Sequence, residues 1–190
     1  MKHLLINLIK NKLLFQSLSE KYDTPLYLYD KNQLIKNINL INKALKDNFN
    51  NFHICYTIKA NNNPSIIKTL KSAIPELGAD CSSPGELYAA KLGNISYNDC
   101  LYTGNYESEH DLKSAFEKNA HINLDDITSF LRLKKIGIPK EISFRLNPGF
   151  GKGAFSQIIT GGKKSKFGIP KSQIIDAYKL AKNNGVKEFG

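Results

Sequence analysis

An alternation of short apolar runs with amphipathic stretches constrains the fold of this chain more than any other feature of its sequence. The apolar runs have the length and composition of strands, and the stretches between them repeat their apolar residues at helical spacing. The expected strands are 52–58, 77–81, 100–103, 121–124 and 141–146, and the expected helices are 31–46, 64–73, 84–92, 108–118, 126–136 and 171–183. Alternating strands and helices with short connections favour a parallel sheet covered by helices.

The spacing of these units predicts part of a barrel. A complete (β/α)8 barrel takes about 250 residues, whereas this chain has 190, with a further strand expected from Val186. No G-x-G-x-x-G motif follows the first strand, which disfavours a doubly wound dinucleotide-binding domain. The expected fold class is therefore α/β, a partial TIM (β/α)8-type barrel of five to six β/α units. A smaller open sheet is the alternative.

The first residues predict a separate arm. Leucine and isoleucine recur at helical spacing over residues 1–18, and Pro25 begins a short extended run. We expect residues 1–30 to form an N-terminal helix and extended arm, with the helix docked on its own domain, and residues 31–190 to form the incomplete barrel. The apolar stretch is interrupted by polar residues, so neither a secretory signal nor a membrane span is expected.

Composition narrows the partners and the compartment. The net charge of +10 comes from lysines spread along the chain, and Arg132 and Arg145 are the two arginines. A nucleic-acid-binding protein more often clusters its basic residues on one face, so nucleic-acid binding is disfavoured. The three cysteines have no C-x-x-C spacing, which is typical of a reducing, cytoplasmic compartment. No histidine has metal-ligand spacing, so no metal site is expected.

Lys59 is the main candidate for chemistry. It ends the expected strand 52–58, and the polar cluster 61–64 follows it directly. A lysine at the mouth of a buried strand is desolvated, which lowers its pKa and leaves a neutral amine that can form a Schiff base with a carbonyl. The alternative is a surface lysine that happens to follow a strand, in a chain rich in lysine.

Six segments, in order, resemble the barrel domain of the fold-type III pyridoxal-phosphate decarboxylases. This family includes diaminopimelate, ornithine, arginine and carboxynorspermidine decarboxylases. The segments are Tyr22 to Asp30, Tyr56 to Asn61, Gly78 to Leu87, Thr103-Gly104-Asn105, Phe144 to Gly149, and Thr160-Gly161-Gly162 with Ser165 to Ile169. The Asn-Pro-Gly and Ser-Lys-Phe-Gly-Ile segments make the diaminopimelate-decarboxylating members the most similar group.

The resemblance implies a cofactor and three residues that contact it. Lys59 matches the lysine that holds pyridoxal 5'-phosphate covalently, Asp80 matches an aspartate that lines the cofactor pocket, and Arg145 matches an arginine near the phenolic oxygen. Lys59 would be the catalytic residue. The implied substrate is a small amino acid, and the implied assembly of a full-length form is a homodimer.

Structural alternatives exist for the residues on these motifs. Asp80 could cap the loop that follows it, and Arg145 could be an ion-pair partner of Glu141 or Asp80. Ser83 is expected to cap a helix that begins at Pro84, with Glu86 completing a capping box. Lys166 could point into the site or be a solvated loop charge.

The activity implied is decarboxylation of meso-diaminopimelate to L-lysine and carbon dioxide. Another decarboxylase of the group, a non-catalytic regulatory relative and a single-domain cofactor-binding protein are the alternatives. The sequence departs from the family at Glu107, where many relatives have a lysine. The family's segments downstream of Gly190 have no counterpart here, so we expect a truncated chain that is inactive alone.

Overall fold

A six-stranded parallel sheet forms the centre of the computed structural model, which describes residues 11–152, 161–162 and 165–190. The strands follow the order β1-β2-β3-β4-β5-β8, so strands consecutive in the sheet are also consecutive in the chain. They are β1 (Cys55–Thr57), β2 (Gly78–Cys81), β3 (Cys100–Tyr102), β4 (His121–Leu124), β5 (Glu141–Phe144) and β8 (Glu188–Phe189). A separate pair, β6 (Leu146–Asn147) and β7 (Ile169–Pro170), is also parallel.

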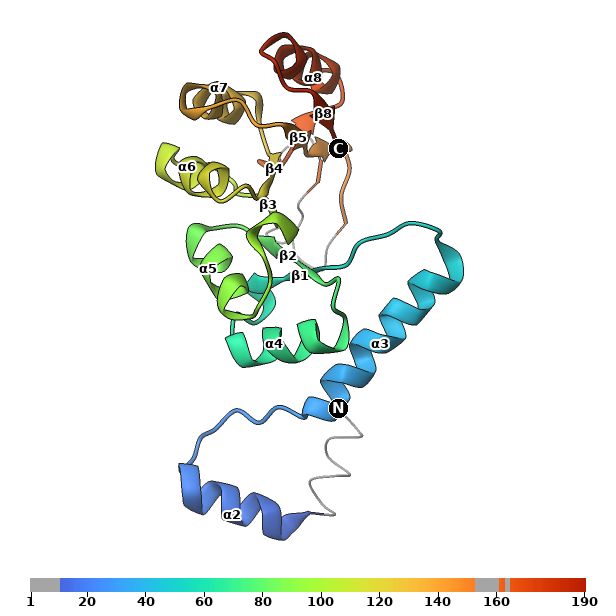
Figure 1. Cartoon of the computed structure of the whole chain (residues 1–190), viewed down its shortest axis with the longest axis vertical. Helices are drawn as coiled ribbons and strands as arrows, with labels where there is room; N and C mark the ends of the chain where they lie inside the picture. The colour runs from blue at the N-terminus through green and yellow to red at the C-terminus, as the bar shows by residue number, and fades with distance from the viewer. Residues whose placement is uncertain (1–10, 153–160, 163–164) are drawn as a thin grey trace.

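Helices connect the strands and cover one face of the sheet. They are α4 (Pro64–Ala73), α5 (Pro84–Leu92), α6 (Glu109–Glu117), α7 (Ile127–Ile136) and α8 (Ile174–Asn183), with short 3-10 turns η1 (Ile58–Ala60) and η2 (Tyr97–Asp99). In Figure 1 the helices α4 to α8 follow one another in an arc along one side of the strands, which is the outer layer of a barrel. The expected partial (β/α)8-type barrel is confirmed.

The core lies between the strands and this helical layer. Alternate strand residues point toward the helices, as the period of two requires. They are apolar and buried in every central strand, namely Ala79, Cys81, Cys100, Tyr102, Ile122, Leu124, Ile142 and Phe144. The three cysteines occupy strand positions, and all are free thiols.

The residues between these apolar positions face the inside of the barrel and are mostly polar. Thr57 and Asp80 hydrogen-bond across β1 and β2, at 3.1 Å between Oγ1 and Oδ2. Ser143 Oγ donates to Asn123 Oδ1 at 2.9 Å, and Asn123 Nδ2 donates to Thr103 Oγ1 at 3.2 Å. The two faces of the sheet are therefore chemically distinct, one apolar and one hydrogen-bonded.

The arm before the barrel differs from its prediction. Helix α2 (Lys12–Tyr22) buries none of its residues, and Leu13 is 82% exposed. The apolar residues of α2 and of the segment after it line a groove of about 780 Å³, among them Phe15, Leu18, Pro25, Leu26 and Leu28. The expectation that this helix docks on the barrel is wrong, because its apolar face meets its own arm. Residues 1–10, expected to begin the helix, lie outside the described residues.

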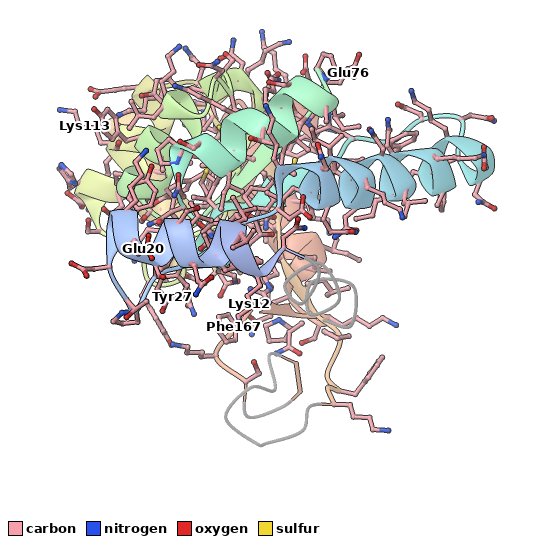
Figure 2. The ribbon with its side chains drawn as sticks, turned by 90° about the horizontal axis from the view of Figure 1, so that it is seen from below. Lys12, Glu20, Tyr27, Glu76, Lys113 and Phe167 are labelled. Carbon is pink, nitrogen blue, oxygen red and sulfur yellow. The ribbon has the colours of Figure 1, made fainter. Side chains whose placement is uncertain are left out.

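Helix α3 (Lys31–Asn48) joins the arm to the barrel. Its Ile38 is buried in a small apolar cluster with Ile66 and Leu70 of α4, and Asp30 caps its first turn by accepting from Gln33 N at 3.0 Å. Figure 1 shows α2 outside the layer of barrel helices, and Figure 2 labels Lys12 and Glu20 towards its two ends. No helix in the described part of the chain is long and apolar enough to cross a membrane.

Helix caps fix where the outer helices begin, with one difference from expectation. Ser83 caps α5, accepting from Glu86 N at 3.2 Å. The Glu86 carboxylate, however, accepts from Ser82 N at 2.7 Å and not from Ser83, so the expected capping box does not form at α5. A complete capping box occurs at α6, between Ser108 and Asp111.

The loop between β3 and α6 contains a buried acid. Glu107 is 5% exposed, and its Oε1 has no hydrogen-bond partner among the described residues. Ser129 Oγ lies 3.0 Å from Glu107 Oε2 and 2.8 Å from Asp126 Oδ2. A hydroxyl has one proton, so it can donate to only one of the two carboxyls at a time. The two carboxyls therefore compete for the proton of Ser129.

The pKa values of Glu107 and Asp126 shift in opposite directions. Burial raises the pKa of Glu107, and Asp126 adds to the increase, while the hydrogen bond from Ser129 and the charge of Arg132 oppose it. For Asp126, burial favours a higher pKa, but hydrogen bonds from Thr128 and Ser129 outweigh it and the pKa is lowered. Asp126 therefore loses its proton more readily than Glu107 does.

A core substitution tests the outer layer. Phe130 on α7 is fully buried, with its ring 6.2 Å from the ring of Phe144. We expect Phe130→Ala to lower the free energy of unfolding by about 3–5 kcal/mol, because it leaves a cavity between helix and sheet. Urea denaturation followed by circular dichroism measures the change. The neighbouring Leu131→Ala, at a residue 38% exposed, is the matched control and should cost less than about 1 kcal/mol.

A second substitution tests the buried acid. Because the folded pKa of Glu107 is raised above its unfolded value, the folded chain binds the proton more tightly, and its contribution to stability falls as pH rises through that window. Glu107→Gln mimics the neutral acid. We expect the variant to equal the wild type below the unfolded pKa and to become more stable by about 1 kcal/mol near neutral pH.

Urea denaturation at a series of pH values measures this difference. The control is Glu109→Gln, at an exposed acid that faces Lys135 at 3.8 Å. The same rise in stability for both variants would show that general surface charge, and not the buried carboxyl, is responsible.

Candidate active site

The three residues singled out in the sequence meet at one cavity. Lys59 lies in η1 directly after β1, Asp80 is the third residue of β2, and Arg145 follows β5 directly. All three line a cavity of about 490 Å³, together with Thr57, Ser82, Leu101, Thr103, Gly104, Asn105, Asn123 and Phe167. Apart from Phe167, which precedes β7, these residues lie in or just after β1 to β5, towards the end of a barrel at which enzymes of this fold place their sites.

Figure 2 shows where Phe167, one residue of this site, lies relative to Glu76. Phe167, which lines the cavity, lies on the opposite side of the picture from Glu76, which precedes β2 at the amino end of the sheet. Lys113, on the outer helix α6, lies apart from both. Phe167 therefore lies away from the amino end of β2 in this view.

Lys59 is exposed, contrary to the expectation of a buried amine. The strand ends at Thr57, and η1 turns the chain so that Ile58 is fully buried and Lys59 is not. Within the described residues β1 is an edge strand paired only with β2, so no second strand covers the lysine on its other side. The expected desolvation of this amine is absent here.

The polar cluster after Lys59 holds η1 in place. Tyr56 donates its hydroxyl proton to Asn61 O at 3.1 Å, and Asn61 Nδ2 donates to the hydroxyl of Tyr29 at 3.0 Å. Asn63 then caps α4, accepting from Ser65 N at 2.9 Å. The turn that carries Lys59 is thus anchored to the extended arm, to β1 and to the next helix.

Arg145 has a partner that sequence reasoning missed. Its Nη1 lies 3.5 Å from Asp125 Oδ1, so the expected pairing with Glu141 or Asp80 is wrong. Glu141 begins β5, at the far end from Arg145, and contacts His121 Nδ1 at 3.4 Å. Asp80 instead accepts a hydrogen bond from Thr57 and lines the cavity. These contacts do not support the alternative in which Asp80 caps the loop that follows it.

Asp125 follows β4 directly and is 3% exposed. Burial raises its pKa, against the opposing effects of the Gly168 backbone N–H and the positive charge of Arg145. The sequence carried a signal for this residue in the doublet Asp125-Asp126 at the end of an expected strand. Without the register of the sheet, nothing indicated which acid of the doublet would meet the arginine.

Cations and aromatic rings alternate at the edge of the cavity. The guanidinium carbon of Arg145 lies 4.7 Å from the centre of the Phe167 ring. Lys166 Nζ lies 5.3 Å from the centre of the same ring and 5.6 Å from that of Tyr106. Such contacts are attractive because a ring presents its negative face to a cation. Lys166 is therefore an exposed loop charge held over two rings, outside the lining of the cavity.

The interior hydrogen bonds were also missed. Asn123 and Thr103 line the cavity and are joined through Ser143 to His121, whose Nε2 lies 3.1 Å from Ser143 Oγ. Polar residues at alternate positions of β4 and β5 were the available signal. The interior hydrogen bonds fix the inner wall of the cavity. Within the described residues, no cluster of three or more His, Cys, Asp or Glu could hold a metal ion. Thr160, part of one family segment, lies outside the described residues.

Comparison with known proteins places this site in context. Residues 33–190 match the family model for the pyridoxal binding domain of pyridoxal-dependent decarboxylases. The chain is 36% identical over 173 residues to a diaminopimelate decarboxylase of Thermoplasma acidophilum, covering 91% of this chain and 41% of that protein. It is 34% identical over 175 residues to one of Methanothermobacter thermautotrophicus, covering 91% and 40%.

Solved structures agree with the sequence matches. Diaminopimelate decarboxylase of Helicobacter pylori, complexed with L-lysine, superposes with a TM-score of 0.80 at 31% identity, covering 90% of this chain and 44% of that chain. A lysine/ornithine decarboxylase of Vibrio vulnificus, complexed with putrescine, superposes with a TM-score of 0.70 over 93% of this chain and 44% of that chain. At 18% identity, it shows the fold alone.

The matches cover only part of each relative, but they support one family assignment. The chain spans about 40% of the length of the curated relatives that it matches. The family model nonetheless covers most of the chain, and the strand ends that form the cavity lie within the matched residues. This chain belongs to the pyridoxal-binding domain family of the pyridoxal-dependent decarboxylases.

Proposed function

We propose that this chain is the cofactor-binding part of a diaminopimelate decarboxylase, which converts meso-diaminopimelate to L-lysine and carbon dioxide. The observation that carries the proposal is the single cavity at which Lys59, Asp80 and Arg145 converge at the carboxyl ends of β1, β2 and β5. The family match supports the cofactor, and relatives at 33–36% identity that are named diaminopimelate decarboxylases support the reaction.

The residues of the cavity fit pyridoxal phosphate. Its volume of about 490 Å³ is within the range of small-molecule sites. It offers an amine, a carboxylate and a guanidinium, besides the hydroxyls and amides of Thr57, Thr103, Asn105 and Asn123. When bound, the cofactor supplies an aldehyde that reacts with amines and a ring that accepts electrons.

Each of the three residues has a distinct role in this proposal. Lys59 presents a solvent-accessible amine on an anchored turn, and its unprotonated form is the nucleophile that holds the cofactor. Asp80, oriented by Thr57, places a negative charge where it attracts a protonated nitrogen. Arg145 places a fixed positive charge opposite, suited to a phenolate or carboxylate oxygen.

The substrate is assigned by similarity and by charge. Diaminopimelate carries two carboxylates, and Arg145 and Lys166 bring two cations to one wall of the cavity and its edge. Another decarboxylase of the group is the second candidate, but the neighbours with those names are 17–18% identical and share the fold alone. A non-catalytic regulatory relative is disfavoured by the presence of all three site residues.

The remaining features of the proposal concern the whole protein. We place it in the cytoplasm, which agrees with the three free cysteines. A homodimer with an amino-acid substrate, and no nucleic-acid or membrane partner, is the proposed assembly. The proposed division into an arm, 1–30, and a cofactor-binding domain, 31–190, agrees with a family match that begins at residue 33.

Covalent trapping tests the role of Lys59. The chain is incubated with pyridoxal phosphate, reduced with borohydride and mapped by peptide mass spectrometry. We expect the pyridoxyl group on Lys59 as the main labelled site, because its amine lines the cavity. Lys59→Ala should remove this label, and the control Lys166→Ala should retain it. Uniform labelling of many lysines, unchanged in Lys59→Ala, would contradict the assignment.

Activity tests the substrate. In the complete gene product that carries this segment, carbon dioxide release is measured with meso-diaminopimelate, ornithine and arginine. We expect diaminopimelate to be preferred, and Lys59→Ala to reduce kcat by at least about a thousandfold, because it removes the covalent attachment of the cofactor. Preference for ornithine or arginine would favour the second candidate, and no turnover with cofactor bound would favour the regulatory relative.

A further inference from the structure

Asp125 is one of two buried carboxylic acids in the described residues, with Glu107, and the one that contacts a residue of the cavity. A carboxylate in such a position needs compensation by hydrogen bonds or an opposite charge. Asp125 finds both, in the Gly168 backbone N–H and in Arg145. Its surroundings therefore connect β4 to two elements that form the cavity wall.

Helix capping does not explain why an acid occupies this position. Asp126 performs that task for α7, accepting from Ser129 N at 2.8 Å and from Thr128 Oγ1. Within the described residues, the side chain of Asp125 makes no hydrogen bond to α7. Its partners are Arg145, which follows β5, and the backbone N–H of Gly168. The two acids of the doublet thus serve different elements.

The backbone brings the partners of Asp125 close to one another. Arg145 N donates to Leu124 O at 2.9 Å, and Ile169 N donates to Arg145 O at 2.7 Å. Gly168 has φ +78°, and a Cβ there would lie 2.8 Å from Asn147 N, so this position requires glycine. The main chain is therefore fixed around Arg145, and the long side chain of the arginine is the part left to be ordered.

Two contacts order that side chain. Asp125 Oδ1 lies 3.5 Å from Nη1, and the Phe167 ring lies 4.7 Å from the guanidinium carbon. An arginine side chain otherwise retains much of its rotamer freedom. We propose that Asp125 is a positioning residue, which acts through Arg145 and the Gly168 backbone to hold the guanidinium and the Phe167 ring at the wall of the cofactor cavity.

The placement itself stands on this chain alone, whereas its consequence for the cofactor rests on the proposed function. Removing the negative charge of Asp125 frees the guanidinium and leaves the cavity without a fixed cation on that wall. The cavity would then keep its volume and its lysine, but it would bind an anionic oxygen less well. The predicted signature is therefore a change at Arg145 with little change in the overall fold.

The small number of arginines makes the test specific. The chain contains two, Arg132 and Arg145, and phenylglyoxal modifies accessible guanidinium groups. The rate of modification of each is followed by peptide mass spectrometry in the wild type and in Asp125→Asn. We expect the rate at Arg145 to rise about three- to tenfold when its charged partner is removed, and the rate at Arg132, which donates to Ser129 Oγ at 2.8 Å, to stay the same.

The matched control is the neighbouring acid. Asp126→Asn weakens the cap of α7 and should leave the rate at Arg145 unchanged. Equal rates at Arg145 in the wild type and in a folded Asp125→Asn variant would overturn the proposal. If circular dichroism shows that Asp125→Asn does not fold, Asp125→Glu replaces it, because this variant keeps the charge but shifts it. We then expect a smaller rise in the modification rate at Arg145. An unchanged rate in folded Asp125→Glu would overturn the proposal.

A second experiment distinguishes a failure of this inference from a failure of the proposed function. Pyridoxal phosphate is added to the wild-type chain before phenylglyoxal, and protection of Arg145 is expected if the guanidinium faces the cofactor. Protection of Arg145 that is lost in Asp125→Asn supports both proposals. An Asp125-dependent rate without protection by the cofactor supports the positioning role and contradicts the placement of Arg145 beside the cofactor.

Discussion

The parallel pairing of β1 to β5 is the constraint on which the rest of the structure depends. Because each strand enters from its outer helix in the same direction, every carboxyl end reaches the same side of the sheet. The period of two then sends apolar residues to the helices and polar residues to the interior. Lys59, Asp80 and Arg145, separated by up to 86 positions in their numbering (145 − 59 = 86), share one cavity for this reason.

Much of this fold was predictable from sequence, because its signals are local. The bounds of α4 and α5 agree with the expectation, since each has a capping residue followed by proline at its first position. The bounds of β4 also agree with the expectation, whereas β1 and β5 are shorter than expected, because β1 ends where η1 begins and the chain after β5 pairs separately as β6. The position of α2 depends on which apolar surface is nearest in space, and a sequence does not give that.

The sequence singled out three motif residues that line one cavity, but it did not indicate their partners. Lys59, Asp80 and Arg145 were found through a family resemblance and through their places at strand ends. Asp125 and Asn123 required the register, since the pairing of β4 with β5 decides which residues face each other across the sheet. Phe167 required the fold of a long loop. The exposure of Lys59 shows the same limit, because the burial of a side chain at an edge strand depends on what lies beyond the edge.

The contacts of Arg145 and Lys59 differ in whether they include an ion pair. Arg145 has a buried carboxylate behind it and a ring beside it, so its charge is fixed in place. Lys59 has no ion-pair partner within 4.0 Å in the described residues, and its turn is held by neutral hydrogen bonds. A nucleophilic amine must lose its proton, which an adjacent carboxylate would oppose, whereas a guanidinium works as a permanent cation. Under the proposed function, this difference in ion pairing suits Lys59 for reaction and Arg145 for binding.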